Sequence, residues 1–118
     1  MEIKEAKDLV KDNDLAVVVF TKGTDFYYDA IGSGETGNWV VDPEVLENVN
    51  RVIIYLRDEK DKLNRIFLGN YAGCRKSPIA NRHIIRFSKL TEVGITNSNW
   101  KDFANSGQNP VSYVGNFY

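Results

Sequence analysis

The sequence predicts an α+β protein, with a curled, mostly antiparallel β-sheet or partial barrel flanked by short helices. Residues 51–57 (RVIIYLR) form a β-branched run, and the charged cluster 58–62 turns the chain back into a second apolar stretch over 64–71. This pattern is typical of an antiparallel hairpin. A third strand is expected over 83–90 after a basic loop, and the short amphipathic segments outside these strands predict the helices.

Length and composition predict a single domain over residues 1–118. The chain is 42% hydrophobic and 26% charged, which is ordinary for a globular protein. A domain of this size buries roughly two thirds of the surface of its unfolded chain, so it needs no disulfide or metal to fold. We therefore expect an ordered domain.

Cysteine usage and hydropathy indicate the setting. The one cysteine, Cys74, and the one histidine, His83, cannot form a disulfide or a Cys/His zinc site, and no cofactor motif is present. The first residues, 1–5, are charged where a signal peptide needs an apolar core, and no apolar run approaches the roughly 20 residues of a membrane span. We expect a soluble cytoplasmic protein with no membrane partner.

The first elements follow from periodicity. Apolar residues spaced three and four apart over 3–11 predict an amphipathic opening helix. The valine-rich run 15–20 predicts a buried strand. Residues 21–38 contain four glycines and predict a long loop, in which some of the aromatic residues Phe26, Tyr27 and Tyr28 line a cleft.

The later elements are shorter. Residues 39–41 predict a brief strand, and Asp42 followed by Pro43 starts a helix that ends near Val49. A final short helix is expected from Ser98 or Asn99 to Phe103, followed by an extended segment over 111–114.

Charge is unevenly distributed along the chain. Residues 1–63 carry 8 Lys/Arg against 14 Asp/Glu, whereas residues 64–118 carry 7 against 2, within an overall net charge of −1. The second half is therefore basic, and it suggests where an anionic partner binds.

The candidate anion-binding residues lie on the loop 72–81 and the strand that follows it. Arg75 and Lys76 are in the loop, and alternation places Arg82, Ile84 and Arg86 on the face of the strand opposite His83, Ile85 and Phe87. Guanidinium groups suit bidentate phosphate contacts. We predict that Arg82 and Arg86 act together.

Several segments in series carry a family resemblance: Gly37-Asn38-Trp39, a helix, the run 51–57, the run 65–69 (RIFLG) and the run 82–87 (RHIIRF). Together they resemble the pseudouridine-synthase-associated (PUA-like) barrel superfamily, in the style of its EVE, ASCH and YTH branches. Those domains are curled mixed sheets that bind RNA or modified bases. The resemblance implies an aromatic pocket for a flipped or single-stranded base, with Trp39 and Tyr71 as the matching residues.

Each candidate has a structural alternative. Trp39 beside two valines is also typical of a core residue, as is Trp100, and His83 beside two isoleucines is typical of a structural histidine. Arg57 and Arg65 flank one turn, and we expect them to pair with Asp58, Glu59 or Asp61. Cys74 beside two cations could be a reactive thiolate, and Asp25, Asp29 and Glu35 could bind a metal for phosphodiester cleavage.

The leading function hypothesis is a non-catalytic domain that binds nucleic acid, single-stranded or with a modified base. Its ligand-binding residues would be Trp39, Tyr71, Arg75, Lys76, Arg82 and Arg86. The second hypothesis is a binder of a small phosphorylated or signalling nucleotide, such as a sequestering protein of a phage or other mobile element. The third is an interaction module, including a homo-oligomer, that uses the aromatic tail Tyr113, Phe117 and Tyr118. An enzyme is the fourth.

Overall fold

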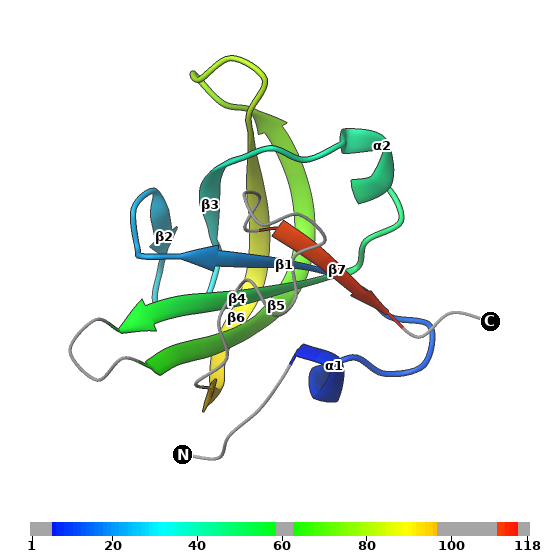
Figure 1. Ribbon diagram of the computed structural model, residues 1–118, viewed down its shortest axis with the longest axis vertical. Coiled ribbons are helices and arrows are strands. Elements are labelled where there is room, and N and C mark those ends of the chain that lie inside the picture. The colour runs from blue at the N-terminus through cyan, green and yellow to red at the C-terminus, as the bar shows by residue number, and fades with distance from the viewer. Residues whose placement is uncertain (1–5, 59–62, 97–110, 116–118) are drawn as a thin grey trace.

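The computed structural model describes residues 6–58, 63–96 and 111–115, and these form one mixed sheet with two one-turn helices (Figure 1). The strand order is β2-β3-β6-β5-β4-β1-β7. The elements are α1 (Ala6–Leu9), β1 (Leu15–Thr21), β2 (Phe26–Tyr28), β3 (Gly34–Trp39), α2 (Pro43–Leu46), β4 (Arg51–Asp58), β5 (Leu63–Lys76), β6 (His83–Thr96) and β7 (Val111–Gly115).

The predicted α+β class is wrong, because the described residues are mostly strand and no helix of theirs exceeds four residues. The opening helix expected over 3–11 is described only as the single turn α1. The helix capped by Asp42 ends at Leu46 instead of near Val49, although the predicted cap forms, with the Glu44 amide donating to Asp42 Oδ1 at 2.9 Å. Segments this short cannot offset the cost of helix nucleation by themselves, so packing on the sheet decides their length.

Residues 21–38, expected as a loop, contain the hairpin β2–β3. The glycines permit this pairing, since a Cβ on Gly34 would collide with the carbonyl oxygen of Tyr27. The strand expected over 39–41 is also displaced, because β3 ends at Trp39. β3 forms because it pairs with β6, and residue propensity alone does not predict pairing with a strand so distant in the sequence.

The predicted hairpin of β4 and β5 is confirmed, with antiparallel pairing from Arg51–Asn70 to Asp58–Leu63. The strands expected over 15–20 and 111–114 are also observed, as β1 and β7. β5 and β6 are longer than expected, at 14 residues each, so the loop that joins them shrinks to 77–82. The predicted helix over 98–103 lies outside the described residues.

β1 lies within the sheet, parallel to β4 and antiparallel to β7, and all seven of its residues are buried. Two apolar clusters cover its opposite faces, as a strand buried on both sides requires. The inner cluster consists of Leu15, Val17, Val19, Trp39, Leu46, Val49, Val52, Ile54, Phe67, Ile85, Phe87, Leu90 and Val111. The outer cluster consists of Val10, Ala16, Val18, Phe20, Ile53, Tyr55 and Ile66.

The sheet is strongly curled. Three strands separate β1 from β3 in the sheet order, yet both contribute to the inner cluster. Figure 1 shows β1 crossing the long strands β5 and β6. The β5–β6 ladder shifts register at three places, between residues 66/67, 68/70 and 71/73 of β5. Bulges of this kind bend strands and increase twist, and they account for the curl.

Arg65 pairs with an acid on the neighbouring strand in the structure. Its guanidinium donates to both carboxylate oxygens of Glu92 on β6, at 3.0 and 2.7 Å, because Arg65 and Glu92 lie on neighbouring strands. Among the expected partners, Glu59 and Asp61 lie outside the described residues. No helix in the described part of the chain is long and apolar enough to cross a membrane.

Substituting Ile54→Ala tests the inner cluster. Ile54 on β4 is fully buried, so truncation leaves a cavity, and we expect the free energy of unfolding to fall by about 2–5 kcal/mol in urea denaturation. Ile31→Ala is the matched control, because Ile31 is 78% exposed and its loss should change stability by no more than about 0.5 kcal/mol. Equal effects of the two substitutions would contradict this assignment of the core.

Glu92→Gln tests the pair with Arg65 through its pH dependence. Hydrogen bonds from Arg65 lower the pKa of Glu92 below its ordinary 4.5, although partial burial opposes the shift. A carboxylate whose pKa is lowered by folding stabilises the protein above its unfolded pKa, and this contribution is lost as the pH falls through the folded value. The free energy of unfolding of the wild type should therefore exceed that of the variant by up to about 1 kcal/mol at neutral pH, and this difference should disappear in acid. A difference that is the same at both pH values would show that charge is not the cause.

Candidate nucleic-acid interface

Four surface hollows adjoin one another through shared lining residues, from β3 and β6 to the β5–β6 loop, and together they are called the furrow here. Each hollow is named here by one cation in its lining. The Arg86 hollow has a volume of about 380 Å³, the Arg75 hollow about 200 Å³, the Arg82 hollow about 390 Å³ and the Lys76 hollow about 230 Å³. Cations therefore line the furrow along its whole length.

Shared residues show that the hollows adjoin. Glu35 lines both the Arg86 and the Arg75 hollows. Asn38, with its neighbours Asp25 and Gly37, lines both the Arg75 and the Arg82 hollows. Arg82 lines its own hollow and the Lys76 hollow. The charged residues that line the furrow are five cations and two acids: Lys22, Arg75, Lys76, Arg82 and Arg86, with Asp25 and Glu35.

Strand register explains how Arg86 and Arg75 come to the same face. Glu35 on β3 pairs with Arg86 on β6 and with Tyr27 on β2, so these three side chains form a row across the sheet. Arg75 on β5 pairs with Ile84 of β6, which lies two residues from Arg86 and therefore on the same face. The alternation predicted for this strand is observed, with Ile85 and Phe87 turned into the inner cluster.

An ion pair fixes Arg75 in the furrow. Its Nη2 lies 2.9 Å from Oε1 of Glu35, and the two side chains are 51% and 32% exposed. Arg75 thus spans the gap from β5 to β3 over the intervening β6. A pair this exposed contributes little to stability, but it holds the guanidinium over the Arg75 hollow.

Asn38 connects the furrow to the β5–β6 loop. Its side-chain amide donates to Asp25 Oδ2 at 3.0 Å and its Oδ1 accepts from the Ser77 hydroxyl. Ser77 Oγ in turn accepts from the amide of Ile79 at 3.0 Å. Arg82 donates to the Asn38 carbonyl oxygen at 3.3 Å. These bonds hold the loop against the end of β3, so Arg82 lies next to the Arg75 hollow.

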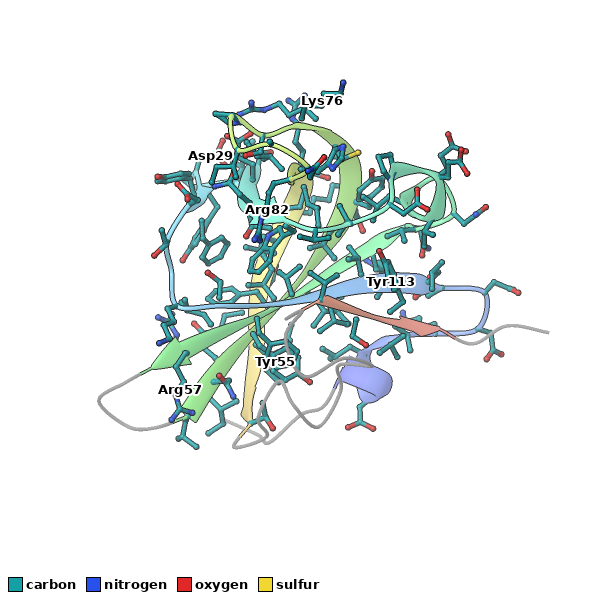
Figure 2. All side chains as sticks on the ribbon, turned by 45° about the horizontal axis from the view of Figure 1, so that its top comes forward. Asp29, Tyr55, Arg57, Lys76, Arg82 and Tyr113 are labelled. Atoms are coloured by element: carbon teal, nitrogen blue, oxygen red, sulfur yellow. The ribbon has the colours of Figure 1, made fainter. Side chains whose placement is uncertain are left out.

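The Lys76 hollow is lined by residues of the β5–β6 loop and its two ends, and this loop lies at the top of Figures 1 and 2. Lys76, Arg82 and His83 line the hollow, and no carboxylate is among its lining residues. His83 Nδ1 is buried and has no hydrogen-bond partner among the described residues. The structural role that the sequence suggested for His83 is compatible with its place opposite Trp39 and Lys76 in the ladder.

The two aromatic residues implied by the family resemblance lie on the inner side of the sheet. Trp39 is 7% exposed, belongs to the inner cluster and donates from Nε1 to Thr36 Oγ1 at 3.2 Å, although it also lines the Arg82 hollow. Tyr71 packs against the inner cluster, outside the four hollows. Burial, together with a hydrogen bond with Cys74, raises the pKa of the Tyr71 hydroxyl above its ordinary value of 10.0. Five of the six predicted residues thus line the furrow, and Tyr71 does not.

Tyr27 is an exposed aromatic residue of the furrow that the six candidates omit. It lines the Arg75 hollow and is 63% exposed, whereas Phe26 and Tyr28 pack against Phe67. The sequence indicated only that some aromatic residues of this segment line a cleft. Alternation along a strand would have singled out Tyr27, but the sequence of this segment predicted a loop.

The groups considered for catalysis are engaged elsewhere. Cys74 packs against the inner cluster, on the strand face opposite Arg75. Asp29 Oδ1 accepts from the amides of Ile31 and Ser33 and so closes a turn. Asp25 and Glu35 contact Asn38 and Arg75. Within residues 6–58, 63–96 and 111–115, no three His, Cys, Asp or Glu side chains are placed to hold a metal ion.

Comparison with protein-family models, with curated proteins and with solved structures finds no match to this chain. The resemblance to PUA-like domains therefore stays a prediction.

Ser77→Ala tests the connection between Asn38 and the loop. The substitution removes the acceptor of the Ile79 amide, so we expect faster hydrogen exchange at Ile79 and a loss of about 1 kcal/mol of stability. Ser33→Ala is the control, since the Ser33 hydroxyl makes no hydrogen bond within the described part of the chain although Ser33 also lines the furrow. Unchanged exchange at Ile79 in the Ser77 variant would disprove the link.

Proposed function

We propose that this protein binds single-stranded nucleic acid along the furrow, without chemistry of its own. The observation that carries the proposal is the recurrence of a cation in each successive hollow: Arg86, Arg75, Arg82 and Lys76. A single-stranded polyanion presents its charges in series and can neutralise them one after another along such a path. The sequence-based hypothesis named the same four residues, together with the aromatic residues Trp39 and Tyr71.

The shape of the furrow favours single-stranded nucleic acid over an enclosed small metabolite as the ligand. Small-molecule sites bury most of their ligand in a concave pocket of about 300–1,000 Å³. Here two of the hollows are smaller than this range and two lie near its lower end, and the lining residues Arg75, Ile79 and Arg82 are exposed. Each hollow has room for one group of a ligand, and the shared walls let several neighbouring groups bind together.

The charge balance favours a single strand over a duplex. Duplex binding depends on many phosphate contacts, whereas this chain has a net charge of −1 and its furrow has five cations against two acids. Exposed aromatic residues add base stacking, which contributes about 1–3 kcal/mol per base and is possible only where bases are unpaired. Tyr27 provides such a face beside Arg75.

A small phosphorylated nucleotide is the second candidate, and the Lys76 hollow favours it. Lys76, Arg82 and His83 surround about 230 Å³ with no acid in the lining, which suits a single phosphate group. In this case the remainder of the furrow would stay unused. Salt dependence distinguishes the two candidates, because release of counterions from a polymer gives a steep slope and a single nucleotide gives a shallow one.

Lys76→Gln and Arg86→Gln test the proposal from the two ends of the furrow. Fluorescence anisotropy with a labelled oligouridylate at several salt concentrations should give a slope of about −3, from four phosphate contacts at about −0.7 each. Each substitution removes about one phosphate contact, so it should weaken binding and make the slope less steep by about 0.7.

Lys11→Gln is the matched control, since Lys11 is exposed and lies outside the furrow. It should leave both affinity and slope unchanged. Equal weakening by Lys11→Gln would point to the overall charge and not the furrow. Binding of mononucleotides with a shallow slope would replace the polymer by the second candidate.

A further inference from the structure

The Arg75 hollow differs from the rest of the furrow, because two carboxylates line it. Asp25 and Glu35 would weaken phosphate binding here, which is unexpected in a furrow that binds only a backbone. Each acid uses one oxygen within the protein: Asp25 Oδ2 accepts from Asn38, and Glu35 Oε1 accepts from Arg75. Asp25 Oδ1 and Glu35 Oε2 accept no hydrogen bond from the described residues, and so they are available to a ligand.

The neighbouring groups hold these acceptors in place. The Asn38 side chain donates a hydrogen bond to Asp25 and accepts one from Ser77. It therefore positions Asp25, and the side-chain carbonyl oxygen of Asn38 is already occupied. Arg75 holds Glu35 and retains further N–H donors on its guanidinium. The hollow therefore presents two anionic acceptors next to one cationic donor.

The rest of the lining suits a flat, partly apolar ligand. Tyr27 offers an exposed ring, and Ile84, Pro78 and Gly37 complete the lining. Gly37 is closely packed, since a Cβ there would lie 2.9 Å from Cγ1 of Ile84. An aromatic side chain beside apolar residues favours a nucleobase over a phosphate or a sugar.

Among nucleobases, guanine matches these groups best. Its Watson–Crick edge carries two adjacent donors, the N1 imino and N2 amino groups, next to the O6 acceptor. Adenine and cytosine offer one donor group on that edge, and uracil offers one flanked by two acceptors that carboxylates repel. We infer that the Arg75 hollow selects guanine, with Asp25 and Glu35 accepting from N1–H and the N2 amino group and Arg75 donating to O6. This inference rests on the proposed binding of single strands.

The test compares oligouridylates that carry one central guanosine, inosine or adenosine. Inosine lacks only the N2 amino group, so guanosine should bind at least about fivefold more tightly than inosine or adenosine. Glu35→Gln and Asp25→Asn should each reduce this preference. The readout is the ratio of the guanosine to the inosine affinity, measured beside the affinity for plain oligouridylate, so that a general effect on strand binding is separated from a loss of base preference. Glu47→Gln, an exposed acid on a different surface, should leave both quantities unchanged.

The outcomes separate the two proposals. Binding of every oligonucleotide with equal affinity would overturn guanine selection and leave strand binding in place. A preference that persists in the Asp25→Asn, Glu35→Gln double variant would also overturn it, because the preference would then arise elsewhere. Failure of any oligonucleotide to bind would overturn the proposed function together with this inference.

Discussion

The pairing of β5 with β6 is the interaction on which both the core and the furrow depend. These two 14-residue strands lie in the middle of the sheet order, and their three register shifts bend the sheet enough for β1 and β3 to share one apolar cluster. The furrow depends on the same two strands, since Arg75 on β5 and Arg86 on β6 line two of its hollows.

Alternation lets one strand serve both purposes. On β6, Ile85 and Phe87 are buried in the inner cluster, whereas Ile84 and Arg86 lie on the face that carries the furrow. The burial of the first pair fixes the backbone and thereby the position of Arg86. Candidate ligand contacts on such a strand are preorganised by packing, unlike contacts on a free loop. Arg82, which precedes the strand, depends instead on its bond to Asn38.

The sequence predicted what local pattern encodes and missed what depends on partners distant in the chain. The β4–β5 hairpin was predictable, because a β-branched run, a charged turn and a second apolar run are contiguous. The hairpin β2–β3 was not, since its glycine-rich segment becomes a strand only by pairing with β6, about 50 residues later. Four basic residues were identified from charge alone. Tyr27, Asp25 and Asn38 were not among the six ligand-binding candidates, because their places in the furrow come from register and from the Ser77 contact. The sequence had indicated Tyr27 only as one of three possible cleft residues and Asp25 only as a possible metal ligand.

The two acids of the furrow show how affinity and selectivity oppose each other here. Removing Asp25 and Glu35 would leave five cations and raise the attraction for any polyanion, yet Glu35 holds Arg75 and Asp25 holds the amide that secures the loop. Their remaining oxygens repel phosphate and attract N–H donors. In the proposed complex, backbone phosphates would therefore lie in the hollows on either side, and a base would lie in the Arg75 hollow. Repulsion of phosphate at one position can thus set the register of a bound nucleic-acid strand, because unfavourable contacts also contribute to specificity.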